Sequence, residues 1–240
     1  MNQLRKYRYT AQTHVGLKRK VNEDAVLALP EHDIWLVADG MGGHDAGDYA
    51  SRLIADAAAM IPLGLDPAAR MQALREAIQN AHTAIRAEAD ARGGGTIGST
   101  VAALVMANQH FAGLWAGDSR IYRLRDGHIE MLTEDHSAVA EFVLAGKMTW
   151  DEAEQHPQSN AITRAVGVGE ELEIDKIRGD TEPGDRFLIC SDGLTKYATF
   201  QILQDALTGT PLETVGDQLI QIALNGGGAD NITAVVIDVM

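Results

Sequence analysis

Four short apolar runs, each with an aspartate at one end, constrain the fold of this chain more than any other feature. Runs of this length that end in turn residues predict buried strands. The four strands are expected at 33–38, 111–116, 186–191 and 231–239, beside Asp39, Asp118, Asp192 and Asp230 in that order. We therefore expect several core strands that each carry a carboxylate at one end.

Helix signals are interspersed with these runs. Asp66-Pro67 is typical of a helix start, and apolar residues recur at helical spacing from there until Gly93. A second helix is expected after Gly43, and a third from a capping-box pattern at 210–213. No Pro/Ser-rich linker divides the chain, so the pattern predicts α/β or α+β layers rather than a helical bundle.

Composition excludes several functions. The chain has 34 acidic and 20 basic residues, a net charge of −14, which disfavours general binding to nucleic acid or anionic lipid. One cysteine, Cys190, excludes a disulfide framework and a cysteine-cluster metal site. The N-terminus does not have the pattern of a signal peptide, and no run approaches the roughly 18 apolar residues that span a bilayer. We expect a cytoplasmic protein without membrane insertion.

Cys190 also does not have the surroundings of a phosphatase nucleophile. A thiolate mechanism needs an arginine six residues on, where this chain has Lys196, and no histidine precedes the cysteine. We therefore expect Cys190 to be a small core residue at the end of a strand.

The aspartates beside the strands have two explanations. Asp before Gly or Asn commonly forms turns, which is sufficient for any one of them. Together with Asp24 they form a set of five, and two carboxylates about 4 Å apart repel by about 4 kcal/mol at an effective dielectric of 20. A cluster would call for hard cations such as Mg²⁺ or Mn²⁺. The residues alone leave a metal site and ordinary turns as equal alternatives.

Seven short motifs carry a resemblance to a known family. They are RKVNED at 19–24, VADGMGGH at 37–44, GST at 98–100, AGDSR at 116–120, LTEDHS at 132–137, CSDGL at 190–194 and DNIT at 230–233. In this order they resemble the series of the metal-dependent PP2C-type (PPM) protein phosphatases. The compact length and the DGMGG form are similar to the bacterial branch. The resemblance runs from about Tyr9 to Val239.

The resemblance implies an α+β fold in a single domain, 1–240. In that family a central β-sandwich of two antiparallel sheets is flanked by helices on both sides, with the metals in a cleft at one end. The polar segment at about 137–159, which contains a capping-box pattern at 149–152, corresponds to a flap beside the active site. An exposed Trp150 would suit a mobile element that contacts substrate, whereas a buried Trp150 would indicate a packed surface subdomain.

The resemblance also implies a catalytic group. Arg19 holds the substrate phosphate, since a guanidinium can bind two phosphate oxygens at once. Asp39 bridges two metals, and the carbonyl of Gly40 binds one of them. Asp192 and Asp230 complete the other metal.

Further residues are implied around this group. Glu23 and Asp24 act through metal-bound water, and Asp118 with Asp192 holds a third, weaker ion. The expected cofactors are therefore two or three Mn²⁺ or Mg²⁺ ions.

The implied reaction is hydrolysis of phosphoserine and phosphothreonine on proteins by direct attack of a metal-bridging hydroxide. The expected partners are phosphorylated proteins: a cognate bacterial Ser/Thr kinase, its substrates and FHA-domain proteins. The protein is expected to be a monomer. One alternative is a pseudophosphatase or phosphoprotein-binding scaffold, although the metal aspartates are all present. The other is a non-catalytic cation-binding domain, which leaves Arg19 unexplained.

One position departs from the family pattern. Animal members have a histidine after the Asp-Gly pair, proposed as the general acid, and this chain has Met41. His44 and a water on the third metal both stay open as donors. His136 is expected to be structural.

Overall fold

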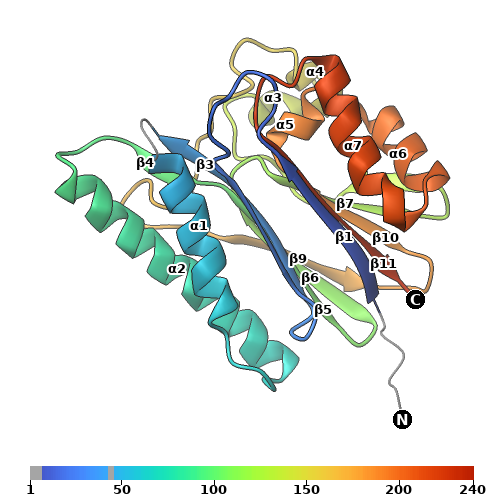
Figure 1. Ribbon diagram of the computed structural model, residues 1–240, viewed down its shortest axis with the longest axis horizontal. Coiled ribbons are helices and arrows are strands. Elements are labelled where there is room, and N and C mark those ends of the chain that lie inside the picture. Colours follow the sequence, from blue (N-terminus) through green and yellow to red (C-terminus); the bar gives the residue numbers. More distant parts are fainter. Residues whose placement is uncertain (1–6, 43–45) are drawn as a thin grey trace.

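The computed structural model describes residues 7–42 and 46–240 of the chain. Its strands form two sheets that pack face to face, with helices on both outer sides (Figure 1). One sheet has the order β1-β11-β10-β7-β8, and the other has the order β2-β3-β5-β6-β9 with β4 paired to β3. Every strand pair is antiparallel. The predicted sandwich of two antiparallel sheets is confirmed.

The expected strands 33–38, 111–116, 186–191 and 231–239 correspond to β3, β6, β10 and β11. The first sheet contains β1 (Tyr7–His14), β7 (Arg120–Arg125), β8 (His128–Met131), β10 (Arg186–Cys190) and β11 (Ile232–Val239). The second contains β2 (Asp24–Leu29), β3 (Ile34–Gly42), β4 (Ile97–Ser99), β5 (Val101–Ala107), β6 (His110–Ala116) and β9 (Asp175–Asp180).

The helices lie outside the two sheets. The second sheet is covered by α1 (Ala46–Ala59) and α2 (Pro67–Ala91), and the first by α5 (Asp192–Thr195), α6 (Phe200–Gly209) and α7 (Leu212–Gly226). Two short helices, α3 (Ala140–Leu144) and α4 (Trp150–Ala153), lie in the polar segment 137–159. Among the described residues, no helix is both long and apolar enough to cross a membrane.

Local sequence predicted some of the helix starts. The Asp66 carboxylate accepts a hydrogen bond from the Ala69 N–H at 2.9 Å, as expected for the cap of α2. The capping box at 149–152 is also confirmed. The helix predicted from 210–213 is present as α7, but the capping box predicted there is wrong. The residue before α7 is Pro211, whose side chain cannot accept a hydrogen bond. Glu213 pairs instead with Arg8 of β1.

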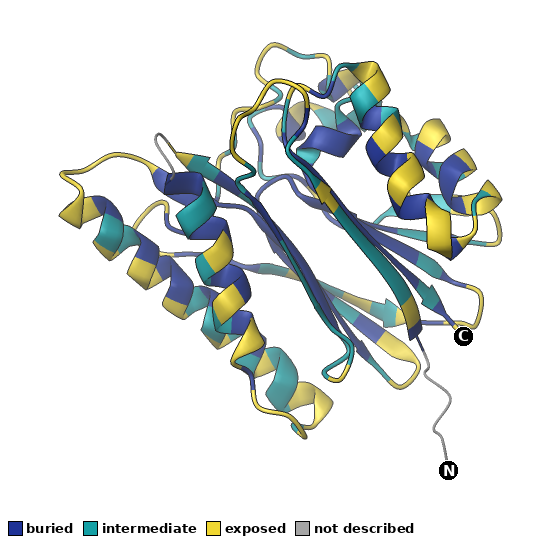
Figure 2. Cartoon of the chain, viewed as in Figure 1, coloured by how far each residue is buried: buried dark blue, intermediate teal, exposed yellow. Residues whose placement is uncertain are grey.

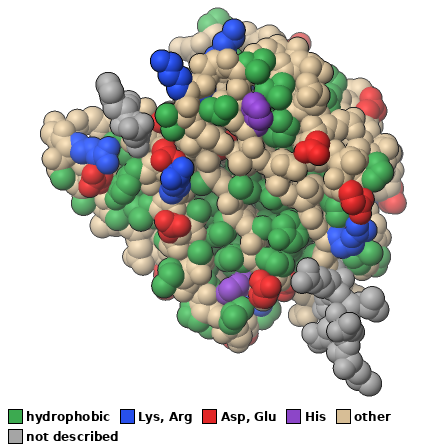
Figure 3. Space-filling view, viewed as in Figure 1, with side chains coloured by type: hydrophobic (Ala, Val, Ile, Leu, Met, Phe, Trp, Pro, Cys, Tyr) green, Lys and Arg blue, Asp and Glu red, His purple; other side chains and the backbone are tan. Residues whose placement is uncertain are grey.

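Three apolar layers hold the sandwich together, and Figure 2 shows the buried residues along the inner strands and the inner helix faces. Trp35 and Phe187 lie between the two sheets, whereas Ile54 of α1 and Leu219 of α7 pack on the outer faces. On the face shown in Figure 3, acidic and basic side chains are interspersed among apolar and polar ones. Burial of these layers fixes the strand register, and the register decides which strand ends meet.

Candidate active site

Asp39 lies on β3 directly opposite Asp24 of β2. The Asp39 N–H donates to the Thr100 hydroxyl at 3.0 Å, and the Asp39 carbonyl accepts from the Thr100 N–H at 2.8 Å. The Ser99 hydroxyl donates to the same carbonyl at 3.0 Å. The GST motif therefore fixes the main chain of Asp39 from the neighbouring strands.

Gly40 lies where β3 passes the start of α1. A Cβ atom at this position would lie 2.1 Å from the carbonyl oxygen of Gly47 and 2.6 Å from that of Glu23. The Gly40 N–H donates to the Glu23 carbonyl at 3.1 Å. Only glycine fits here, because any side chain would separate α1 from the strand that carries Asp39.

Asp24 is buried between the sheets and is hydrogen-bonded across them. Its Oδ2 accepts from the Ser191 hydroxyl at 2.8 Å and from the Thr233 hydroxyl at 2.7 Å. Burial raises the pKa of Asp24 to about 7, although these two hydroxyl donors oppose the shift. Ser191 and Thr233 are not among the site residues expected from the sequence. Their place in the motifs, one residue before Asp192 and two after Asn231, was the available signal.

Asn231 fixes the loop that carries the first motif. Its side-chain amide donates to the carbonyls of Val15 at 2.9 Å and Val21 at 3.0 Å. Its Oδ1 accepts from the N–H of Glu23 at 2.8 Å. One side chain from the start of β11 therefore holds both ends of the loop around Arg19.

Arg19 extends from that loop to Asp230. Its Nη2 donates to Asp230 Oδ2 at 2.9 Å, and half of the Arg19 side chain remains exposed. The hydrogen bond to Asp230 is the largest cause that raises the pKa of the Arg19 guanidinium. Burial raises the pKa of the Glu23 carboxyl, against the nearby charge of Arg19. Arg19, Glu23 and Asp230 therefore form the more exposed side of the group.

The predicted aspartates converge on Asp39. Burial is the largest cause that raises its pKa well above the ordinary value. The next causes are the negative charges of Asp24, Asp192, Asp118 and Asp230. The pKa of Asp118 is raised well above normal for the same reasons, with burial first and the charge of Asp192 next. Residues from five separate motifs are thus close enough to affect one another's charge.

Several carboxylate oxygens of this group are buried without compensation. The Oδ1 atoms of Asp24, Asp118 and Asp192 have no hydrogen-bond partner among the described residues. Within residues 7–42 and 46–240, no three His, Cys, Asp or Glu side chains are grouped tightly enough to hold an ion as they stand. The site offers oxygen ligands only, and some of its carboxylate oxygens are free. Such a site fits hard divalent cations, which can complete their coordination with water.

Asp118 follows a glycine turn that His136 holds in place. Gly117 has a φ of +113°, and a Cβ atom there would lie 2.6 Å from Thr100 Cγ2. The Gly117 N–H donates to the ring Nδ1 of His136 at 3.1 Å, and the main-chain N–H of His136 donates to the Gly117 carbonyl at 2.9 Å. The imidazole stacks on Trp115. These contacts support the structural role expected for His136.

Met41 cannot be the general acid. Met41 pairs with Gly98 of β4, and its Cε lies 3.0 Å from where a Gly98 Cβ atom would be. A thioether has no proton to give. His44, the other candidate, lies outside the described residues.

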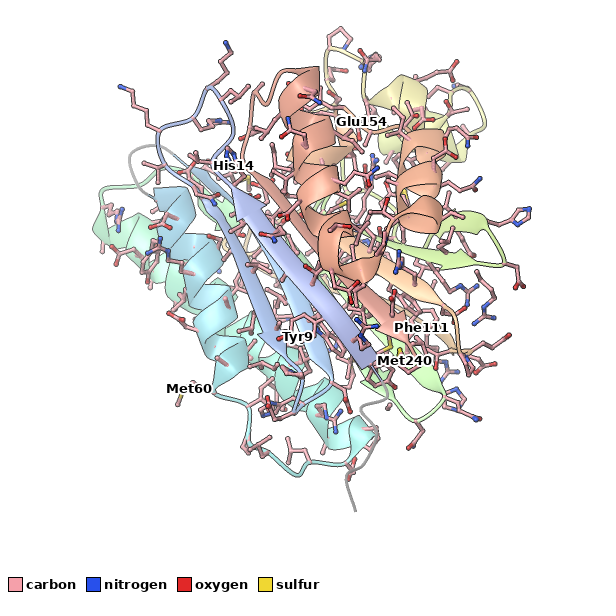
Figure 4. All side chains as sticks on the ribbon, turned by 45° about the vertical axis from the view of Figure 1, so that its right-hand side comes forward. Tyr9, His14, Met60, Phe111, Glu154 and Met240 are labelled. Atoms are coloured by element: carbon pink, nitrogen blue, oxygen red, sulfur yellow. The ribbon has the colours of Figure 1, made fainter. Side chains whose placement is uncertain are left out.

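Arg120 is the first residue of β7 and anchors the segment 137–159 beside Asp118. Its guanidinium donates to both oxygens of Asp135, at 2.9 and 2.6 Å, and lies 2.8 Å from Glu154 Oε1. It also lies 5.3 Å from the centre of the Trp150 ring. Trp150 is half-buried, which is intermediate between the two alternatives expected for it. Figure 4 shows Glu154 and His14 at the same end of the sandwich, away from Met60 and Met240.

Cys190 is completely buried at the end of β10. Burial raises the pKa of its thiol far above the range in which a thiolate would form. The prediction that it is a core residue is confirmed.

Comparison with known proteins gives a consistent result. The family model "Protein phosphatase 2C" matches residues 14–232. PppA, described as a key regulatory component of T6SS in Pseudomonas aeruginosa, is 43% identical, with a TM-score of 0.91 over 98% of both chains. The serine/threonine protein phosphatase PstP of Mycobacterium tuberculosis is 38% identical over 237 residues, which are 97% of this chain but 45% of PstP. The solved catalytic domain of PstP in complex with two manganese ions is 36% identical, with a TM-score of 0.84 over 97% of each chain. Fold, motifs and relatives agree that this chain belongs to the protein phosphatase 2C family.

Proposed function

We propose that this protein is a metal-dependent phosphatase that hydrolyses phosphoserine and phosphothreonine on other proteins. The observation that carries the proposal is the group of aspartates, whose buried oxygens include three without a partner among the described residues, beside the half-exposed Arg19. Arg19 pairs with Asp230 but keeps half of its side chain exposed, so its guanidinium remains accessible to a phosphoryl group. Ser/Thr phosphatases among the relatives favour the enzyme over a pseudophosphatase.

The proposed ligands follow the positions in the fold. Asp39, the Gly40 carbonyl, Asp192 and Asp230 hold two divalent cations, Mn²⁺ or Mg²⁺. Asp118 holds a third together with Asp192, and Glu23 and Asp24 act through water. When bound, such ions supply a water acidic enough to attack phosphorus near neutral pH and positive charge for the phosphoryl oxygens. The two manganese ions of the PstP catalytic domain support this assignment.

Arg19 binds and orients the substrate phosphate. Its planar fork can donate to two phosphoryl oxygens, and its exposed half leaves room for a protein substrate. Asn231 holds the loop on which Arg19 lies, so the guanidinium reaches the site from a fixed main chain. No cysteine is available as a nucleophile, which agrees with direct attack by water.

The substrates are phosphorylated proteins that meet the site at the end of the sandwich, next to the flap at 137–159. We include a cognate Ser/Thr kinase, the substrates of that kinase and FHA-domain proteins. Because PppA is described as a component of T6SS regulation, regulators of secretion are further candidates. The single-domain organisation, the cytoplasmic location and the monomeric state stay predictions.

The proposal is tested by hydrolysis of a phosphothreonine peptide and of p-nitrophenyl phosphate with Mn²⁺ or with EDTA. We expect turnover only with the metal, and a loss of about 1000-fold or more in Asp192→Asn. The matched control is Asp205→Asn on the exposed side of α6, which should keep full activity. Metal-independent turnover, or full activity of Asp192→Asn, would contradict the mechanism. Tight binding of the phosphopeptide without hydrolysis would instead support the pseudophosphatase.

A further inference from the structure

Lys196 lies among the aspartates, although the proposed reaction does not use it. It follows the short helix α5, one turn after Asp192. Its Nζ lies 2.6 Å from Asp192 Oδ2 and 3.5 Å from Asp230 Oδ2. Only 18% of its side chain is exposed. A lysine this buried between two carboxylates is a counter-ion built into the site.

The surroundings keep Lys196 charged. Burial acts against the ammonium ion and is the largest single cause, but the negative charges of Asp192, Asp230 and Asp39 together raise the pKa of Lys196 above its ordinary value. The geometry agrees, since Nζ lies within contact distance of a carboxylate oxygen of both Asp192 and Asp230.

Lys196 and a divalent cation compete for the same oxygens. Asp230 Oδ2 accepts from Arg19 and contacts Lys196, and Asp192 Oδ2 is taken by Lys196. A cation on these oxygens would lie within a few ångströms of the ammonium, where like charges repel strongly. The long, flexible lysine side chain can move away toward solvent, unlike a main-chain group.

We propose that Lys196 is a displaceable counter-ion that neutralises Asp192 and Asp230 and thereby weakens the binding of divalent cations at these carboxylates. The proposal rests on the metal site of the proposed function. It gives Lys196 two opposite effects: the side chain stabilises the protein when divalent cations are scarce, and it opposes their binding when they are present. The position of Lys196 thus sets the concentration of divalent cation that is needed to occupy the site.

The experiment is calorimetric titration of Mn²⁺ into EDTA-treated and dialysed protein. We expect Lys196→Gln to bind Mn²⁺ roughly tenfold more tightly than the wild type. Lys196→Arg keeps the charge and should stay near wild-type affinity. Lys176→Gln on β9 changes the net charge equally at an exposed position and should also leave the affinity unchanged.

Thermal unfolding gives a second readout that does not depend on activity. Lys196→Gln should melt at a lower temperature than the wild type without the metal and show a larger increase with Mn²⁺. Lys196→Met, which keeps an apolar stem, should behave in the same way. A variant that folds only with Mn²⁺ would support the proposal, whereas variants that fail to fold even with Mn²⁺ would overturn it.

Unchanged Mn²⁺ affinity in Lys196→Gln would overturn the counter-ion role, because the lysine would then not oppose metal binding. Weaker affinity would overturn it too, because the lysine would then position the carboxylates for the metal. Failure of the proposed function has a different signature. In that case the wild type itself would take up no Mn²⁺, whatever residue stands at 196.

Discussion

Two groups of buried charge lie side by side at one end of the sandwich, and they differ in how their charges are compensated. The Arg120 cluster consists of Arg120, Asp135, Glu154 and Trp150. The aspartate cluster consists of Asp24, Asp39, Asp118, Asp192 and Asp230. Residues of both line the same small pocket, among them Arg120 and Asp135 of the first and Asp118 and Asp192 of the second.

In the Arg120 cluster every charge has a partner. The guanidinium donates to both oxygens of Asp135 and contacts Glu154, and the Trp150 ring lies against it. In the aspartate cluster three carboxylate oxygens have no partner among the described residues, and burial raises the pKa of Asp39 and Asp118. Unpaired buried charge costs stability, so it points to a group that arrives from outside, whereas paired charge points to structure.

The largest expected effect separates activity from stability in the aspartate cluster. Asp39→Asn should lower kcat/KM by about 1000-fold or more. The same change should raise the free energy of unfolding of the EDTA-treated protein by about 1 kcal/mol, because it removes one of several repelling charges. Phosphatase assays and urea unfolding measure the two effects. A variant that loses both activity and stability would contradict the comparison.

The Arg120 cluster should respond in the opposite way. Asp135→Asn leaves the buried Arg120 guanidinium short of negative charge and should lower the free energy of unfolding by about 3 kcal/mol. The pair Arg123–Glu130, in which the Glu130 side chain is 57% exposed, provides the control, since Glu130→Gln should cost about 0–1 kcal/mol. Urea unfolding of both variants decides the matter, and equal losses would show that burial does not distinguish the two pairs.

Divalent cations should stabilise only one of the two clusters. At a Mn²⁺ concentration 100 times the Kd, the free energy of unfolding should rise by about 2.7 kcal/mol. Thermal unfolding with and without Mn²⁺ should show this increase in the wild type and in Asp135→Asn, but not in Asp39→Asn. An increase that persists in Asp39→Asn would place the ion elsewhere.

Trp150 tests how firmly the segment 137–159 is attached. Trp150→Leu removes the aromatic face above Arg120 and should cost about 1 kcal/mol, with faster proteolysis within the segment. Trp150→Phe keeps an aromatic ring and should lose less. If Trp150→Leu is as stable as the wild type, the stacking does not anchor the flap.

The smallest expected effect concerns His136, which holds the turn before Asp118. Burial lowers the pKa of His136, and its Nδ1 must stay unprotonated to accept from Gly117. Below the unfolded-state pKa of about 6.5 the unfolded chain binds a proton that the folded protein excludes, so stability falls as the pH falls. His136→Gln should reduce the slope of unfolding free energy between pH 7 and pH 5. Burial also lowers the pKa of His82, so His82 should still contribute to the pH dependence of stability in this variant.

Local sequence predicted the elements with strong local signals. The start of α2 at Asp66, the four strands beside the aspartates and the capping box of α4 follow from spacing and residue type. The capping box predicted at 210–213 was wrong because Glu213 forms an ion pair with Arg8, which is distant in the sequence. The partners of Asp24 could not be predicted either, because Ser191 and Thr233 lie 167 and 209 residues away and meet it only through sheet packing.

By itself the sequence determined which residues have the chemistry: a set of aspartates at strand ends, one arginine beside them and glycines where chains pass closely. Only the tertiary structure decided which of these charges are compensated. Arg120 is balanced by Asp135 and Glu154, whereas the aspartates share Arg19 and Lys196 and keep oxygens that have no partner in the described part of the chain. The physical reason is that compensation depends on distance and burial, which arise from the register of strands far apart in the chain.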